Sequence, residues 1–252
     1  MEPARKLPRV LSIAGSDSGG GAGIQADLKA FARCGVHGMT AITAITAQNT
    51  VAVTGVWPIA PEAIVGQVRA VVDDIGVDAV KIGMLGDAPA VLDPVMVAES
   101  GASLLHPEAQ SALRERLLPR AAVATPNVHE AAALAGLDEP ADVEALARAA
   151  HALGPRAVVV TGGHRDEAID VFYDGERLVE IPGERYEGGA AHGSGCTHSS
   201  ALAAHLALGF EPLEAARAAK RIAAEAVRHG LTRIGAGPGP VDVFGLEGGD
   251  AI

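Results

Sequence analysis

The chain has 252 residues, 48% of them hydrophobic, and its formal net charge at pH 7 is -11. That length suffices for one sizeable α/β core, so we expect a single domain over residues 1–252. The acidic balance argues against nucleic acid or an anionic membrane as a partner, because both require clustered cations. No segment is long and apolar enough to span a bilayer, so we expect a cytoplasmic protein that acts on small molecules.

Short β-branched runs alternate with longer Ala- and Leu-rich stretches, a pattern typical of βαβ units and a mostly parallel sheet. In chain order we predict a strand at 9–14, a helix at 24–34, a strand at 40–46, a helix at 61–75 and strands at 78–84 and 90–95. A helix at 106–118, a strand at 122–125, helices at 128–135 and 141–153 and a strand at 157–161 follow. Strands at 168–173 and 178–181, joined through Asp174-Gly175, form a hairpin before helices at 194–208 and 212–228.

A glycine-rich turn, Ala14-Gly15-Ser16-Asp17-Ser18-Gly19-Gly20-Gly21-Ala22-Gly23, connects the first strand to the first helix. Backbone amides in such a turn can surround a ligand, but the spacing matches neither GxGxxG nor a P-loop. A flexible strand-to-helix turn explains it equally well. Asp27, early in the following helix, is by itself explained as a partner of the helix dipole.

Acidic residues follow two predicted strands. Asp93 ends the strand at 90–95, and Asn127 with Glu130 follows the strand at 122–125. Ligands of parallel sheets gather at the carboxyl ends of strands, where Asp93 and Glu130 would hold Mg²⁺ directly or through water. Alternatively, Asn127 and Glu130 form only a helix capping box.

Two further motifs belong to the same predicted sheet edge. Thr161-Gly162-Gly163-His164 ends a strand, and His192-Gly193-Ser194-Gly195-Cys196 begins an Ala-rich helix. A helix N-terminus presents unpaired amides and the positive end of the dipole, and glycines let an anion approach closely. The second motif therefore favours binding of a phosphoryl group.

Together these motifs resemble the hydroxymethylpyrimidine/phosphomethylpyrimidine kinases of thiamine biosynthesis. The resemblance rests, in chain order, on AGSDSGGGAGIQADLKAF, TAITAQNT, KIGMLG, VLDPVMVAESG, LLP…ATPNVHEA, TGGH, HGSGCTHSSALAA and the C-terminal GPGPVDVF. It implies a ribokinase-like, three-layer α/β/α fold with a central mostly parallel sheet and a small antiparallel hairpin. It also implies a homodimer.

The implied activity is transfer of phosphate from ATP, with Mg²⁺, to 4-amino-5-hydroxymethyl-2-methylpyrimidine and then to its monophosphate. The pyrimidine pocket would be formed by Gly15, Asp27, Gln48, Met84 and Val95. The donor and acceptor functions of Gln48 and the acceptor oxygens of Asp27 suit an aminopyrimidine edge.

The implied catalytic group is the anion hole formed by the amides of Gly193, Ser194, Gly195 and Cys196. Cys196 occupies the position of the family's catalytic residue, and a helix N-terminus tends to lower a thiol pKa, which favours a thiolate base. A positioning role for Cys196 stays open. Nucleotide contacts are expected from Asn127, Thr161, Gly163 and His192, and metal contacts from Asp93 and Glu130.

Two departures from the family pattern stand out. Thr161 stands where many relatives have a lysine, which would shift phosphate neutralisation to Mg²⁺, the amides or Lys81. Only residues 85–89 separate two predicted parallel strands, whereas a parallel crossover takes about a dozen residues or more. Either the sequence omits a segment, which we favour because a true deletion would displace Met84 and Asp93, or the protein lacks the crossover helix and pairs these strands differently.

Two other functions are weighed. A pyridoxal-type kinase shares the fold and also phosphorylates a hydroxymethyl group on a flat nitrogen heterocycle. A pyrimidine-binding regulator without turnover would keep the pocket, but the intact Gly193 to Cys196 motif, Asp93 and Glu130 argue against it.

Overall fold

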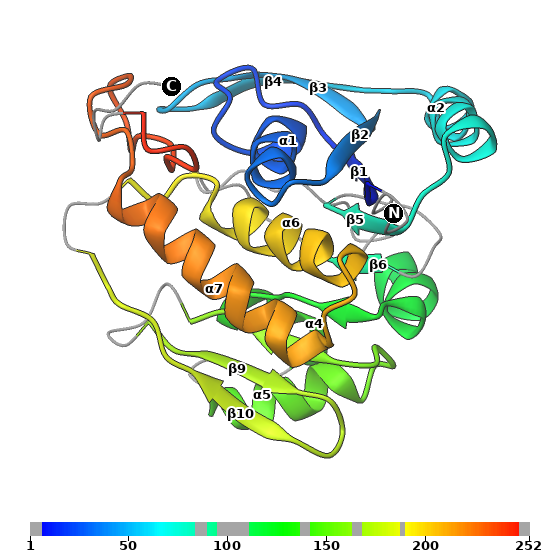
Figure 1. The fold of residues 1–252 in the computed structure, drawn as a ribbon, viewed down its shortest axis with the longest axis vertical. Helices are drawn as coiled ribbons and strands as arrows, with labels where there is room; N and C mark the ends of the chain where they lie inside the picture. The colour runs from blue at the N-terminus through cyan, green and yellow to red at the C-terminus, as the bar shows by residue number, and fades with distance from the viewer. Residues whose placement is uncertain are drawn as a thin grey trace, which may run out of the picture.

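A computed structural model of the chain describes residues 7–83, 90–94, 111–136, 142–162, 168–186 and 190–246. Eight strands form one sheet in the order β10-β9-β8-β7-β6-β5-β1-β2 (Figure 1). They are β1 (Arg9–Ala14), β2 (His37–Ile42), β5 (Ala79–Ile82), β6 (Ala90–Leu92), β7 (Val123–Ala124), β8 (Val158–Val160), β9 (Asp170–Tyr173) and β10 (Leu178–Ile181). Neighbouring strands are parallel except at the β8–β9 and β9–β10 pairs, which confirms the predicted sheet and hairpin.

Helices cover both faces of the sheet. One face packs against α1 (Gly23–Arg33), α6 (Ser194–Ala207) and α7 (Pro212–Arg228). The other packs against α2 (Pro61–Asp74), α4 (Val128–Ala135), α5 (Val143–His151) and the short turns η1 (Leu113–Leu117) and η2 (Leu118–Arg120). In β8, Val159 joins the first core while Val158 and Val160 join the second, as the alternation of side chains along a strand requires. The described helices include none with the length and apolar character needed to cross a bilayer.

Local sequence signals account for several helix boundaries. Proline stands at the start of both α2 and α7, where its missing amide leaves no helical hydrogen bond unmade. Asn127 and Glu130 form a reciprocal capping box at the start of α4. That helix ends at Gly136, whose φ of 65° is favourable for glycine. These signals explain why the predicted ranges of α4 and α7 agree with the structure.

The predicted strand at 40–46 is wrong in one respect. The chain turns at Thr43, so that β2 joins the main sheet while β3 (Ala44–Gln48) pairs antiparallel with β4 (Val53–Pro58) in a separate ribbon. The strand at 53–58 was not predicted, because this ribbon is largely exposed and carries little periodic burial. The predicted helix at 106–118 falls partly outside the described residues. Its end is π-helical and then 3-10, where Pro119 cannot donate an amide hydrogen bond.

β5 and β6, which lie close together along the chain, are both short strands. β5 ends at Ile82 and β6 begins at Ala90, and Val80 pairs with Ala90 in parallel register. The alternative that these strands pair differently is therefore wrong. The amide of Asp93 donates to the carbonyl of Ile82 at 2.9 Å, so Asp93 lies at the carboxyl edge of the sheet. The connection itself lies outside the described residues.

Candidate active site

The N-terminus of α6 lies against the glycine-rich loop. Gly193 caps the helix with φ 85°, and a side chain there would overlap the carbonyl oxygen of Gly21 at 1.7 Å. A Cβ at Gly195 would meet open space. One prediction needs correction: the amide of Ser194 already donates to the carbonyl of Ala191 at 3.0 Å, so it is not available to an anion here. The other predicted donors, the amides of Gly193, Gly195 and Cys196, are not affected by this correction, since a helix start leaves such groups without intrahelical acceptors.

Asp17 holds the glycine-rich loop together, a role that sequence reasoning missed. Its carboxylate accepts hydrogen bonds from the amides of Gly19 (2.8 Å), Gly21 (3.0 Å) and Ala22 (2.8 Å). His192 Nε2 lies 3.2 Å from the same carboxylate and thereby joins the loop to the start of α6. Burial alone would raise the pKa of Asp17, but these hydrogen bonds lower it, so the group is a carboxylate at neutral pH. Asp17 is thus a partner of His192 in this structure.

A buried ion cluster lies beneath α6. Lys81 on β5 and Asp27 on α1 are both 0% exposed, and Lys81 Nζ lies 3.0 and 3.2 Å from the two Asp27 oxygens. Ser12 and Ser200 also donate to Asp27, at 2.5 and 2.7 Å. Lys81 Nζ is 3.8 Å from Asp93. Lys81 is therefore enclosed and paired, which contradicts the idea that it meets phosphate in place of a lysine at position 161.

Sequence alone contained a signal for this cluster. A lysine in an otherwise apolar strand is almost never buried unless it is paired, so KIG at 81–83 called for an acidic partner. The nearest acid in sequence would have been the wrong choice, because Asp27 lies 54 residues away. Since both oxygens of Asp27 are engaged by protein side chains, its described role is to compensate the charge of Lys81.

The Cys196 thiol lies near this cluster. We expected a lowered pKa, but burial and the nearby carboxylates of Asp93 and Asp27 raise the pKa of Cys196 to about 12, against the opposing influence of Lys81. The amide of Gly23 also donates to the sulfur. The residue keeps some accessible surface. At neutral pH the group is a neutral thiol, so the expected thiolate is not present in this state.

Asp93, Asn127 and Thr161 are brought to one edge of the sheet. β6 pairs with β7, which precedes Asn127, and Asn127 forms a bridge with Thr161 at the end of β8. Asp93 is buried and accepts a hydrogen bond from Ser199 at 2.9 Å. Glu130 accepts from the amide of Asn127 at 2.9 Å, so the capping interpretation is confirmed.

The residues predicted for the pyrimidine are only partly described. Gly15 accepts a hydrogen bond from the amide of Ile24 at 2.9 Å and lies in the turn after β1. Gln48 ends β3 beside that turn. Its backbone amide donates to the hydroxyl of Ser18 at 2.8 Å, and that hydroxyl donates to the backbone carbonyl of Gln48 at 2.6 Å. Met84, Val95 and Gly163 lie outside the described residues.

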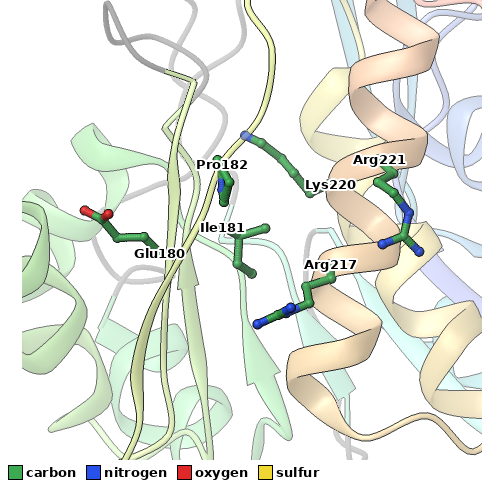
Figure 2. A pocket seen from close by; sticks show the side chains of 6 residues that line it. All are labelled: Glu180, Ile181, Pro182, Arg217, Lys220 and Arg221. Carbon is green, nitrogen blue, oxygen red and sulfur yellow. The ribbon is translucent and has the colours of Figure 1, made fainter.

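A cavity of about 270 Å³ opens between the end of β10 and α7. Glu180, Ile181 and Pro182 form one wall, and Figure 2 shows the side chains of Arg217, Lys220 and Arg221 projecting from α7 on the other. Ile181 pairs with Asp170 at the start of β9, and Val171 pairs with Val160 at the end of β8, so the cavity lies at the same sheet edge as Thr161. Sequence reasoning did not predict this site.

The sequence model of the phosphomethylpyrimidine kinase family matches residues 17–242. The chain belongs to this family. It is 46% identical to the hydroxymethylpyrimidine/phosphomethylpyrimidine kinase of Streptomyces coelicolor, over 93% of this chain and 94% of that protein.

Among solved structures, the chain resembles the ADP complex of Bacillus subtilis pyridoxal kinase, with a TM-score of 0.87, 40% identity and coverage of 96% and 99% of the two chains. It also resembles Staphylococcus aureus pyridoxal kinase in complex with AMP-PCP and pyridoxal, with a TM-score of 0.86, 34% identity and coverage of 96% and 95%. These similarities confirm the predicted ribokinase-like fold.

Family membership also bears on the short β5–β6 connection. The alignment with the Streptomyces kinase runs over 253 positions, although 93% of 252 residues is only about 234. That kinase therefore carries residues with no counterpart in this sequence. Both an omitted segment and a true deletion would produce such a difference. A displaced Asp93 is not observed, because its amide hydrogen bond to Ile82 and its contact with Ser199 keep it at the sheet edge.

The described carboxylates fit the Mg²⁺ that a kinase of this family implies. Asp93 and Glu130 follow neighbouring strands, and carboxylate oxygens are ligands that Mg²⁺ prefers. The described residues contain no group of three or more His, Cys, Asp or Glu side chains placed to hold a metal. A site with one or two carboxylates suits an ion that takes its other ligands from phosphate and water.

Proposed function

We propose that this chain transfers phosphate from ATP to the hydroxymethyl group of 4-amino-5-hydroxymethyl-2-methylpyrimidine, and then to the resulting monophosphate. The observation that carries the proposal is the geometry at the start of α6. Gly193 lets the glycine-rich loop, which Asp17 holds together, lie directly against the helix, while the space beside Gly195 is open. This arrangement in a member of the phosphomethylpyrimidine kinase family supports phosphoryl transfer, which depends on positioning and charge neutralisation.

In this proposal the γ-phosphoryl group lies at the amides of Gly193, Gly195 and Cys196. The dipole of α6 and the absence of a side chain at Gly195 favour an anion there. Cys196 is assigned a positioning role, because a thiol whose pKa is raised to about 12 is a poor base at neutral pH. Asp93 and Glu130 would hold Mg²⁺, which neutralises phosphate charge when bound.

The substrate pyrimidine is assigned to Gly15, Gln48, Met84 and Val95. The short hydrogen bonds between Ser18 and Gln48 fix the end of β3 beside the glycine-rich loop. Asp27 is assigned an indirect role at this site. Both of its carboxylate oxygens accept hydrogen bonds from protein donors, so it holds Lys81 in place and does not bind the pyrimidine itself.

ATP is assigned to the carboxyl edge of the sheet, from the ends of β7 and β8 to the cavity beside α7. Asn127 and Thr161 line its phosphate end in this proposal, with His192 acting through Asp17. Gly163, which lies outside the described residues, is assigned to the same end from the sequence motif alone. The nucleoside end is assigned to the cavity between β10 and α7, where guanidinium groups can stack on a purine.

We propose that the chain forms a homodimer through the β3–β4 ribbon. Ile45, Val56 and Trp57 of this ribbon are 40%, 47% and 57% exposed, although ribbons of two strands are only marginally stable alone. Light scattering should give twice the mass of 25.4 kDa for the wild type and a monomer for Trp57→Lys. A wild-type monomer at micromolar concentration would contradict the proposal.

The decisive experiment offers ATP and Mg²⁺ with the pyrimidine alcohol, its monophosphate or pyridoxal as separate substrates. We expect phosphorylation of both pyrimidines, with diphosphate product identified by mass spectrometry. Diphosphate formation separates this function from that of a pyridoxal-type kinase. Efficient turnover of pyridoxal alone would establish the alternative, and binding of the pyrimidine without ATP consumption would indicate a regulator.

A further inference from the structure

Asp170 at the start of β9 connects three parts of the molecule. Its Oδ1 atom accepts hydrogen bonds from the amide of Gly162 at 2.9 Å and from Lys220 Nζ at 2.6 Å. Its Oδ2 atom lies 3.4 Å from Nε2 of His198. Gly162 lies two residues after the end of β8, Lys220 lines the cavity on α7, and His198 lies on α6 two residues beyond Cys196.

The contact between Asp170 and His198 is incomplete. His198 is 3% exposed, and within the described part of the chain neither of its ring nitrogens has a hydrogen-bond partner, nor has Asp170 Oδ2. Buried polar groups without partners are unfavourable, and native structures contain few of them. A small movement of α6 or β9 would form this hydrogen bond, so the pair is one that ligand binding can complete.

The contact between Asp170 and Lys220 is complete. Lys220 is 8% exposed, and a side chain at Gly183 would lie 2.3 Å from its Cε, so the glycine leaves room for the lysine stem. Burial opposes ionisation of Asp170, but His198 and Lys220 hold its pKa below the usual value, so the carboxylate is charged at neutral pH. Arg217 and Arg221, the other cations of the cavity, are exposed and lie outside this buried pair.

We propose that Asp170 is a positioning residue for the nucleotide: it fixes Lys220 in the cavity wall and Gly162 after the end of β8, and it transmits cavity occupancy to α6 through His198. The proposal rests on the assignment of the nucleoside to this cavity. Asp170 acts through Lys220 and His198 and does not itself touch substrate.

The test uses Asp170→Asn, Lys220→Met and the double variant in the full chain. We expect each single variant to raise the KM for ATP and the Kd for ADP about tenfold, because a charged hydrogen bond that orders the site is lost. The KM for the pyrimidine should change less than about twofold, and the double variant should raise the ATP KM by less than the product of the single effects. Asp78→Asn is the matched control: it removes a carboxylate that pairs with Arg9 at 2.8 Å in another part of the fold, and it should leave both KM values unchanged.

Unchanged ATP KM and ADP Kd in folded Asp170→Asn and Lys220→Met would overturn the proposal, as would equal changes in both KM values. If the single variants do not fold, the double variant, which leaves no unpaired charge, and His198→Gln provide the test: a wild-type Kd for ADP in both overturns it. The measurement of ADP binding by calorimetry needs no second substrate. A wild-type chain that binds ADP but does not phosphorylate the pyrimidine would therefore refute the proposed substrate without deciding the role of Asp170.

Discussion

Replacement of Lys81 by methionine tests the buried ion cluster most directly. Methionine keeps most of the volume of lysine but removes the ammonium, which leaves Asp27 with only Ser12 and Ser200 as donors. Both side chains of the pair are 0% exposed, so water cannot replace the lost partner. Breaking a buried ion pair by removing one member typically destabilises a protein by about 3–5 kcal/mol.

That loss is a large part of the total stability of a domain, which is about 5–15 kcal/mol. In a chain of this length, about 1 kcal/mol corresponds to a fall in Tm of about 2–4 °C, so Lys81→Met should melt roughly 6–20 °C below the wild type. Urea unfolding followed by circular dichroism measures the free energy. The cluster also predicts that Asp27→Asn combined with Lys81→Met destabilises less than Lys81→Met alone, because Asp27 no longer carries an unpaired charge, whereas the loss of Lys81 beside Asp93 is common to both variants.

The control is Arg33→Met, which removes an ion pair with Glu225 whose two side chains are 50% and 59% exposed. Exposed pairs contribute about 0–1 kcal/mol, so this variant should unfold close to the wild type. A destabilisation of Lys81→Met no larger than that of Arg33→Met would refute the reasoning, as would a double variant less stable than either single variant.

Three further predictions concern the loop and the start of α6. Gly193→Ala should abolish turnover and lower Tm, because the φ of 85° and the overlap with the Gly21 carbonyl both oppose a side chain. Gly195→Ala, whose side chain meets open space, should keep the wild-type Tm, and an equal Tm of the two variants would contradict this. The lowered pKa of Asp17 contributes stability that is present above the unfolded pKa of about 3.9 and is lost as pH falls through the folded pKa. The difference in unfolding free energy between wild type and Asp17→Asn, measured in urea, should therefore shrink below about pH 4, and a constant difference would count against this role of Asp17. Iodoacetamide labelling of Cys196 and Cys34 should still accelerate above pH 9, because their pKa values are raised to about 12 and about 11. A plateau of Cys196 labelling below pH 9 would show that Cys196 is a thiolate at that pH after all.

Much of the fold could be predicted from local patterns. The ranges of α4, α7 and β10 follow from a capping box, an N-terminal proline and the Asp174-Gly175 turn signal, each of which acts within a few residues. The ribbon of β3 and β4 could not be predicted in the same way, because its exposed residues lack the alternation that burial imposes. The helix before Pro119 changes type near its end because proline cannot donate an amide hydrogen bond, which the sequence shows. The sequence does not show that the change is to π-helical and then 3-10 hydrogen bonding.

The candidate site divides along the same line. Glycines at 193 and 195, the acids at 93 and 130 and the cysteine at 196 are recognisable because their chemistry depends on residue type and spacing. The partners of Lys81 and the cavity on α7 are not, since they join residues 54 and about 39 positions apart through the packing of separate elements. The expected thiolate at Cys196 was wrong for the same reason: the helix N-terminus is a local effect, and burial beside Asp93 and Asp27 outweighs it.

The sequence by itself determined the family, the order of elements and the set of polar residues at strand ends, because these depend on local preference and on motifs in fixed order. Only the tertiary structure decided which charges are free to meet a ligand. Lys81 is paired with Asp27, the amide of Ser194 donates to the carbonyl of Ala191, and His192 contacts Asp17. Lys220, by contrast, lines a cavity while it is paired with Asp170. The physical reason is that the availability and pKa of a polar group depend on burial and on partners brought together from distant parts of the chain.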